Sequence, residues 1–520
     1  MWTDFEKPDL AKWRSLAERD LKGQDFDQAL AWSTADGLEG LPLYHEGPQP
    51  QPLLTNNHWK IRQDYHESLQ GVDQIRLRQP HDLNRLPRDV ECVVFGPGLD
   101  RTLARLLEEN VPFQGRLSWD PVAEGADFDQ VVELVQAAQR RPDLKFLSCS
   151  GWPYHQGGAT PAQELGWTLA SVVFLLRELT SRGITPAEVV SRLEVELAVS
   201  QDLFIEVAKL RAARLCLRQI FGAYSHSGDC DLHARQSLQR HSLLDPGNNL
   251  LRATVAGFAA VCGGADSIQL AAFAEDDPDG LRLACNQQLL MRHEASLGAV
   301  ADPGAGSYYL ENLTHQLGQR SWEIMAGVQA RGGVTDQHDS IAESLRNQRE
   351  ARLKSVARGR SVLVGVNWFA DPGEWLRSAT RPPVESPYPA LFEGEPFEKF
   401  RCEPGPRCLI LTVGRGLAQA RASFASSFLA AGSFPQETPL PVESTAEARQ
   451  LLEASYASLV VLCASDERLA ELIEQLAFGD KILAVAAPPQ PLAGVDFFLH
   501  RKADHLDLLT KLREACRETT

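Results

Sequence analysis

The sequence predicts an α/β protein built as a (β/α)8 barrel followed by a smaller, doubly wound α/β domain. The chain has 520 residues, and single hydrophobic cores stop growing at about 250 to 300 residues, so at least two domains are expected. From residue 90 onward, short apolar segments alternate with longer helical patterns, which is typical of parallel βα units. A proline-rich stretch interrupts this alternation at residue 371, and a second, shorter alternation follows it.

The first alternation fits a (β/α)8 barrel, for which about 250 residues are typical. Short apolar runs predict strands, and runs with apolar residues on one helical face predict helices. The predicted strands are residues 92–95, 115–118, 145–148, 267–270 and 361–364. The predicted helices are residues 163–180, 186–199, 203–224, 248–262, 281–295 and 311–331. An open, doubly wound sheet has the same period and is the alternative.

The second alternation predicts a compact unit of its own. It is preceded by residues 371–406, whose eight prolines indicate a linker or wrapping segment. Its predicted strands are residues 408–413, 458–463 and 481–486, and its predicted helices are residues 417–431, 467–478 and 506–516. Three strands with intervening helices predict a flavodoxin-like sheet, in which a ligand lies beyond the carboxyl ends of the strands.

An amphipathic helix precedes the barrel. Leu10, Trp13, Leu16 and Leu21 are spaced so that they lie on one helical face. Such a stripe docks either on the chain's own barrel or on a partner chain, and we favour the partner. The expected organisation is therefore an arm over residues 1–55, a barrel over 56–370, a linker over 371–406 and a second domain over 407–520.

Composition excludes several classes of protein. A formal net charge of −17 at pH 7 repels phosphate backbones, so nucleic-acid binding is not expected. No apolar run approaches the ~20 residues that span a bilayer, and the first residues lack the pattern of a signal peptide. The ten cysteines are scattered, several within apolar segments, and are expected to be reduced core thiols. These observations predict a cytoplasmic protein that does not bind membranes.

Six motifs resemble, in order, those of the methylmalonyl-CoA mutase family. Trp-Lys-Ile-Arg-Gln at 59–63 resembles the family's Trp-Thr-Ile-Arg-Gln at the barrel entrance. Ser-Gly-Trp-Pro-Tyr-His-Gln-Gly-Gly-Ala at 150–159 resembles its Ser-Gly-Tyr-His-Met-Gln-Glu-Ala-Gly-Ala. The others are Glu-Val-Ala-Lys-Leu-Arg-Ala-Ala-Arg at 206–214, Leu-Asp-Pro-Gly-Asn-Asn at 244–249, Asp-Pro-Gly-Ala-Gly-Ser-Tyr-Tyr at 302–309 and Leu-Val-Gly-Val-Asn at 363–367. A single match of this kind is weak evidence for the family, but six matches in the same order are specific to it.

The resemblance implies a fold, a cofactor and a partner. In that family the barrel binds acyl-CoA along its axis, and a C-terminal domain holds adenosylcobalamin against the barrel mouth. The cofactor carries the radical step that interconverts methylmalonyl-CoA and succinyl-CoA. Bacterial enzymes of the heterodimeric type also contain a small subunit with the same plan and no cobalamin. Residues 5–30 resemble the arm by which that subunit wraps its large catalytic partner.

The sequence departs from the family pattern at three positions of the barrel. Register places Asp64 where the family has a tyrosine beside the reacting carbons, and Pro153 where it has a histidine that hydrogen-bonds the thioester carbonyl. Arg235 begins the run that replaces the family's His-x-Gln-Thr-Ser-Gly. These substitutions indicate a degenerate substrate site, so no catalytic residue is expected in this chain.

The second domain departs from the family as well. The axial histidine of the family comes from an Asp-x-His-x-x-Gly motif after the first strand of this domain. Here that strand is followed by Gly414, Arg415 and Gly416, with neither Asp nor His. No histidine occurs between His338 and His500. We therefore expect this chain to hold neither cobalamin nor a metal.

Together, the resemblance and its departures predict the non-catalytic small subunit of a heterodimeric methylmalonyl-CoA mutase. Two alternatives remain open: an active mutase with rearranged ligands that uses His155, and a cobalamin-free acyl-CoA-binding protein that acts alone. We also predict that Trp152, Tyr154 and Arg235 point inward and plug the barrel axis.

Overall fold

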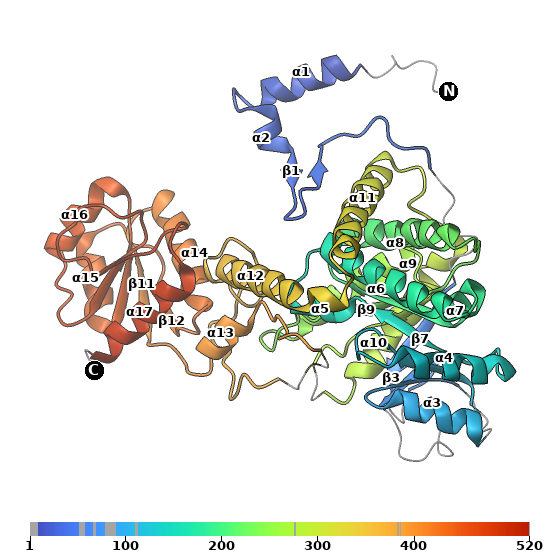
Figure 1. Cartoon of the computed structure of the whole chain (residues 1–520). Coiled ribbons are helices and arrows are strands. Elements are labelled where there is room, and N and C mark those ends of the chain that lie inside the picture. The colour runs from blue at the N-terminus through green and yellow to red at the C-terminus, as the bar shows by residue number, and fades with distance from the viewer. Residues whose placement is uncertain are drawn as a thin grey trace.

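The predicted barrel is present in the computed structural model, which describes residues 9–50, 58–65, 69–78, 90–109, 113–274, 277–381, 384 and 386–518. Eight parallel strands form a closed barrel, in which β10 pairs with both β9 and β3 (Figure 1). The strands are β3 (Lys60–Asp64), β4 (Gln74–Arg78), β5 (Glu91–Phe95), β6 (Gly115–Trp119), β7 (Lys145–Ser150), β8 (Leu193–Val199), β9 (Asp231–Gln236) and β10 (Ser267–Gln269). An open sheet over this part of the chain is excluded.

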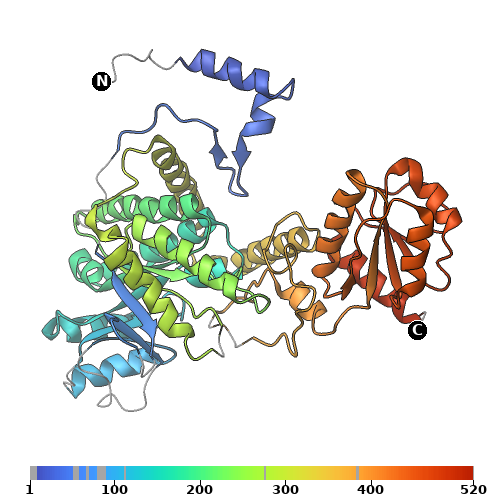
Figure 2. The same ribbon diagram turned by 180° about the vertical axis from the view of Figure 1, so that it is seen from behind.

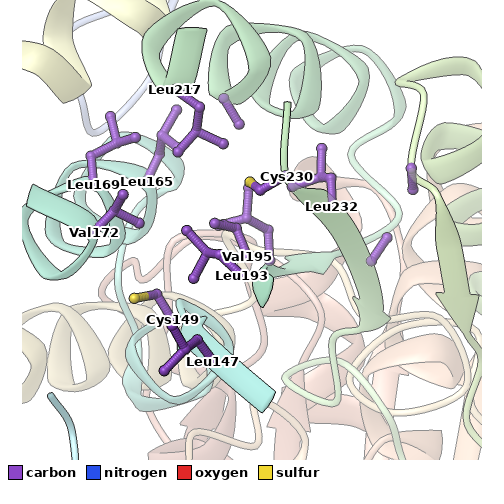
Figure 3. Close-up of a cluster of buried hydrophobic side chains, with 14 of the residues drawn as sticks. Leu147, Cys149, Leu165, Leu169, Val172, Leu193, Val195, Leu217, Cys230 and Leu232 are labelled. Carbon is purple, nitrogen blue, oxygen red and sulfur yellow. The ribbon is translucent and has the colours of Figure 1, made fainter. Parts of the chain in front are cut away.

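Helices cover the outside of the barrel. They are α3 (Leu99–Glu108), α4 (Phe128–Ala137), α6 (Pro161–Ser181), α7 (Pro186–Arg192), α8 (Leu203–Ala223), α9 (Gly247–Cys262) and α10 (Gly280–Leu289). The short helix α5 (Trp152–Gly157) directly follows β7. Figure 3 shows how Val195 and Leu232 from the strands meet Leu165 of α6 and Leu217 of α8. Burying each such side chain contributes about 1.5–3 kcal/mol, so this layer fixes the strands on which the site residues stand.

The helix predicted at residues 186–199 is wrong in its second half. The helix α7 ends at Arg192, and β8 begins at Leu193. The sequence Leu-Glu-Val-Glu-Leu-Ala-Val alternates, so Val195 faces the outer apolar layer while Glu194 faces the barrel interior. Arginines on other strands pair with this glutamate. These pairs allow its charge to be buried inside the barrel.

The strand predicted at residues 361–364 is also wrong, because these residues form a turn outside the barrel. Val364 makes only an isolated bridge to Trp368. The buried Asn367 side chain accepts from the Leu363 N–H at 2.7 Å and donates to the Ser361 carbonyl at 2.8 Å. Its amide thus replaces the hydrogen bonds that a strand ladder would provide. The barrel is completed instead by β3, β4, β8 and β9, none of which the patterns predicted as strands.

Two long helices follow the barrel. The helix α11 (Tyr308–Ala330) packs against α6 and α8 and confirms the helix predicted at residues 311–331. The helix α12 (His338–Ala357) extends from the barrel to the second unit in both views (Figure 1, Figure 2). The segment through α13 (Glu395–Phe400) then contacts the barrel, where the Leu391 N–H donates to the Gln156 carbonyl at 2.7 Å. Residues 382, 383 and 385 of the predicted linker lie outside the described residues.

The second unit is a five-stranded parallel sheet with helices on both faces. The strand order is β12 (Gln436–Glu437), β11 (Cys408–Thr412), β13 (Leu459–Cys463), β14 (Ile482–Val485) and β15 (Phe497–Phe498). One face packs on α14 (Leu417–Ala430) and α17 (His505–Glu518), and the other on α15 (Thr445–Ala454) and α16 (Asp466–Gln475). This is the doubly wound, flavodoxin-like arrangement predicted. The patterns missed the two short edge strands and α15.

The N-terminal arm has a docked part and an undocked part. It comprises α1 (Leu10–Asp20), α2 (Phe26–Leu30) and a hairpin of β1 (Trp32–Ser33) and β2 (Glu39–Gly40). In the hairpin turn, the Asp36 carboxylate accepts from the Ala162 N–H at 3.1 Å and from the Thr160 hydroxyl, at the start of α6. By contrast, α1 buries none of its residues and stands away from the barrel in both views (Figure 1, Figure 2). Residues 1–8 and 51–55 of the predicted arm lie outside the described residues.

The state of the cysteines and the length and polarity of the helices agree with what the composition predicts. All ten cysteines are free, and most of them are buried. Burial raises the pKa of thiols such as Cys408, to about 12, so they remain protonated core groups. Among the described helices, none is both long enough and apolar enough to cross a bilayer.

Candidate functional site

Buried charged side chains fill the axis of the barrel. Arg62 of β3 donates to both carboxylate oxygens of Glu194 on β8, at 3.0 Å and 2.6 Å. Arg116 of β6 also reaches Glu194, with 2.9 Å between Nη1 and Oε2. All three side chains are at most 4% exposed. Because β3, β6 and β8 are not neighbours in the barrel, these contacts can form only through its interior. We call these three residues the axial cluster.

The Glu194 side chain of the axial cluster is ionised although it is buried. Burial alone would raise the pKa of Glu194, but Arg116 and Arg62 together lower it below its ordinary value. Glu194 is therefore a carboxylate, held by a bidentate, charge-assisted contact with Arg62. The net free energy of such a buried cluster is small, but removing one partner leaves an uncompensated charge and is costly.

Further ion pairs close the amino-terminal end of the barrel. Lys145 at the start of β7 lies 2.6 Å from Asp231 at the start of β9, and Arg116 reaches the same carboxylate at 2.9 Å. Lys60 and Glu91, at the starts of β3 and β5, lie 2.6 Å apart. Any molecule lying along the axis would have to displace these pairs as well as the axial cluster.

Asp64 lies at the carboxyl end of β3, where the predicted site begins. Its carboxylate accepts from Arg76 at 3.3 Å and from the Gln269 side chain at 3.2 Å. The Arg76 guanidinium in turn stacks on Phe95, 3.4 Å from the ring centroid. A carboxylate held in this way offers a substrate neither the aromatic surface nor the hydroxyl of the family's tyrosine.

Arg235 lies at the carboxyl end of β9, near the mouth of the barrel. Its guanidinium lies 3.7 Å from the ring centroid of Trp152 and 3.5 Å from the Glu196 carboxylate. Trp152 donates its indole N–H to the Gln236 carbonyl at 3.1 Å, which fixes the ring. Tyr154 takes no part in this stack, because it packs against Trp167 of α6 and Tyr388. Of the three residues predicted to plug the axis, Arg235 and Trp152 thus stack on each other, whereas Tyr154 packs elsewhere.

Pro153, the third predicted position, lines a cavity of about 700 Å³ at the carboxyl end of the barrel together with Arg76 and Tyr154. Proline carries no donor that could bind a thioester carbonyl. The same cavity is lined by Asp120, whose carboxyl accepts the backbone N–H groups of Ser150 and Ala123. Burial raises the pKa of Asp120 to about 6 despite these hydrogen bonds.

The axial cluster was not predicted from the sequence, although a signal for it exists. Charged residues recur at every second position of the strands, as in Lys60, Arg62 and Asp64 of β3 and in Glu194 and Glu196 of β8. A period of two places such residues on one face of a strand. Charges on the inner faces of several barrel strands can be satisfied only by one another.

Protein groups engage both ring nitrogens of His155, whereas the alternative of an active mutase requires one of them for the substrate. Its Nδ1 lies 3.1 Å from the Glu164 carboxylate, and its Nε2 lies 2.7 Å from the Ser237 hydroxyl. Lys209 of α8 lies 2.7 Å from the same Glu164 oxygen and 2.7 Å from Glu206. The histidine is thus one member of a buried polar network between α5, α6 and α8.

The loop after β11 in the second unit contains neither of the ligands that the family's motif supplies. Gly414 and Gly416 have positive φ values of 101° and 59° and make the turn into α14. Between them, Arg415 is exposed and pairs with Glu443 at 2.9 Å. Neither a glycine backbone nor a guanidinium is a cobalt ligand, so this loop does not fit the axial position of a cobalamin.

His505 at the start of α17 is enclosed by aromatic rings. Its ring centroid lies 4.5 Å from that of Phe428 and 5.0 Å from that of Trp368. Neither ring nitrogen has a hydrogen-bond partner among the described residues. Burial lowers the pKa of His505 from 6.5 to about 4. This imidazole is a neutral core group.

His505 predicts a pH dependence of stability. Above pH 6.5 it is neutral in both the folded and the unfolded chain, and as the pH falls toward 4 only the unfolded chain gains the proton. At about 1.4 kcal/mol per pH unit, the free energy of unfolding should fall by up to about 3 kcal/mol over this range. Urea denaturation of wild type and His505→Phe at several pH values measures this difference. If the difference in unfolding free energy between wild type and His505→Phe does not change between pH 6.5 and 4, the prediction is wrong.

Comparisons with known proteins agree with this architecture. The sequence model of the family described as methylmalonyl-CoA mutase matches residues 123–382. A methylmalonyl-CoA mutase small subunit of Porphyromonas gingivalis is 27% identical over 98% of this chain and 97% of its own length. One of Streptomyces virginiae is 32% identical over 91% of this chain and 90% of its own. A methylmalonyl-CoA mutase of Cereibacter sphaeroides is 32% identical over 72% of this chain and 65% of its own. The chain belongs to the methylmalonyl-CoA mutase family.

Proposed function

We propose that this chain is the non-catalytic small subunit of a heterodimeric methylmalonyl-CoA mutase, whose large subunit interconverts methylmalonyl-CoA and succinyl-CoA. The axial cluster of Arg62, Arg116 and Glu194 carries the proposal, because it occupies the path that acyl-CoA takes in the family. Breaking a buried pair by removing one partner costs about 3–5 kcal/mol. A substrate would have to overcome a comparable cost in order to enter.

The proposal assigns adenosylcobalamin to the large subunit alone. When bound, that cofactor supplies the radical that starts the isomerisation. Two observations support its assignment to the partner: the loop of Gly414 and Gly416 carries no imidazole, and His505 is neutral and enclosed by Phe428 and Trp368. The chain would then contribute structure and stability to the complex.

The arm supports pairing with a larger chain. The relatives from Porphyromonas gingivalis and Streptomyces virginiae are named small subunits, a name that implies a larger partner. Leu10, Trp13 and Leu16 are between 37% and 43% exposed on α1, which buries nothing against its own barrel. Docking this face on a partner would remove apolar surface from water, which favours association. The hairpin anchored by Asp36 would hold the arm in place for this contact.

The two alternative functions have less support. An active mutase that relies on His155 needs this imidazole at the substrate, but Glu164 and Ser237 hold it outside the axis. A stand-alone acyl-CoA-binding protein needs an open channel, and the axial cluster fills that channel.

Pairing and activity can be tested together. The full chain, purified alone, is expected to show no isomerisation of methylmalonyl-CoA in the presence of adenosylcobalamin. Co-expression with the large mutase chain of the same host is expected to give a complex of one copy of each, with activity. Turnover by the isolated chain would refute the proposal, and the absence of any complex would refute its pairing.

A further inference from the structure

Ser237, His155 and Glu164 form a line of hydrogen-bonded groups outside the barrel axis. The Ser237 hydroxyl lies 2.7 Å from Nε2 of His155, and Nδ1 of His155 lies 3.1 Å from Oε2 of Glu164. Ser237 directly follows β9, His155 lies on α5 and Glu164 on α6. A hydroxyl next to an imidazole that a carboxylate orients is the arrangement by which enzymes activate a serine.

The surrounding hydrogen bonds determine which groups of this line donate and which accept. Glu164 accepts the Ala198 N–H at 2.6 Å on Oε1 and Lys209 at 2.7 Å on Oε2. Burial would raise the pKa of Glu164, but Lys209 and His155 lower it below its ordinary value, so it is a carboxylate and only accepts. In its neutral form, His155 must therefore donate from Nδ1, which leaves Nε2 as the acceptor of the Ser237 proton. This is the tautomer that a general base requires.

Ser237 also borders open space, although the residue is only 9% exposed. Ser237 and His155 both line a cavity of about 520 Å³ between the barrel and the turn of the arm hairpin. Asp36, Asp202, Glu206 and Glu393 contribute four carboxylates to its wall, against the two guanidinium groups of Arg240 and Arg352. This excess of negative charge disfavours anionic molecules. Even with Glu206 paired to Lys209, an acyl group without negative charge is therefore favoured in this cavity over an anionic one.

We propose that Ser237 is a nucleophile, with His155 as its general base and Glu164 as a positioning residue, in a site that hydrolyses small, uncharged acyl esters. The Ser237 oxygen attacks the ester carbonyl carbon as its proton passes to Nε2 of His155. The bond to the leaving alkoxide then breaks, and His155 returns the proton to that alkoxide. Water attacks the acyl-serine by the same route, which releases the carboxylic acid and restores the hydroxyl. This site is independent of the role proposed for the chain within the mutase.

Covalent labelling of the full chain tests the assignment. A fluorophosphonate probe is expected to modify Ser237, as identified by mass spectrometry of the digested protein. His155→Gln should slow this labelling on the order of 100-fold, because base catalysis by a positioned imidazole contributes about 10²–10⁴-fold. Ser321→Ala is the matched control: Ser321 is buried on α11 without a base, and its replacement should not change the rate. Wild type left unmodified at Ser237 would overturn the proposal, as would a folded His155→Gln labelled at the wild-type rate.

Two further measurements keep the proposal testable if His155→Gln does not fold. Wild type should release a burst of p-nitrophenol from p-nitrophenyl acetate, and Ser237→Ala should lose that burst; a burst that persists would overturn the proposal. Glu164→Gln tests the positioning residue through the pH profile of Ser237 labelling. The profile should move to lower pH, because the carboxylate no longer stabilises protonated His155. A folded variant with an unchanged profile would remove Glu164 from the assignment.

Discussion

Replacing Glu194 by Gln is expected to lower the free energy of unfolding by about 3–5 kcal/mol. The amide keeps the shape of the side chain but leaves Arg62 and Arg116 facing each other without their shared carboxylate. Both guanidinium groups are buried, so water cannot compensate the loss. Urea denaturation monitored by circular dichroism at pH 7 measures the change, since Glu194 is fully ionised there.

Two variants control for this result. Glu443→Gln breaks an ion pair with a similar distance, 2.9 Å to Arg415, but both side chains are more than half exposed and no measurable change is expected. Replacing Arg62, Arg116 and Glu194 together by Met, Met and Leu should recover most of the stability, because apolar residues of similar volume can replace a buried ionic cluster. If Glu194→Gln behaves like Glu443→Gln, the axis is solvated, and the filled barrel is refuted.

Replacing Trp13 by Ala is expected to weaken the complex with the large subunit at least about 30-fold in Kd. Trp13 is the largest side chain on the exposed face of α1, and buried tryptophans that anchor interfaces often contribute about 2 kcal/mol or more. A free-energy change of about 1.4 kcal/mol is tenfold in Kd. Isothermal titration calorimetry of the two purified subunits measures this affinity.

The control for Trp13 comes from the same helix. Arg19 is 72% exposed and, among the described residues, pairs with its neighbour Asp20, so Arg19→Ala should change Kd by less than about twofold. Because Trp13 also packs on Phe26 of α2, the helicity of each variant has to be compared by circular dichroism. Equal affinities of the Trp13→Ala variant and the wild type would show that this face of α1 is not the docking surface.

The sequence predicted the architecture because its strongest signals are local. Helices α6, α8 and α9 begin and end within a few residues of the predicted bounds, since long amphipathic patterns leave little ambiguity. β8 was misread because the capping box of Thr185 and Glu188 starts a helix and the following Leu-Glu-Val-Glu is ambiguous by propensity. The arginines across the barrel decide between helix and strand for this segment, and they come close to it only in the folded protein.

The candidate site was only partly predictable for the same reason. Asp64, Pro153 and Arg235 could be identified as departures because motifs fixed their register. By contrast, Arg62 and Glu194 lie 132 positions apart, and His155 and Ser237 lie 82 apart. No local pattern relates such pairs until the closed barrel brings their strands and helices together. Of the three residues predicted to point inward together, Trp152 and Arg235 stack on each other, but Tyr154 packs elsewhere.

The most direct test of the central claim is retention of adenosylcobalamin by the isolated chain. The purified chain is mixed with an excess of the cofactor and desalted, and the corrinoid absorption of the protein fraction is then measured. The loop of Gly414, Arg415 and Gly416 offers no axial histidine, so we expect no bound corrinoid spectrum. The large subunit, treated in the same way, should retain one. Stoichiometric retention by this chain alone would contradict its assignment as the non-catalytic subunit.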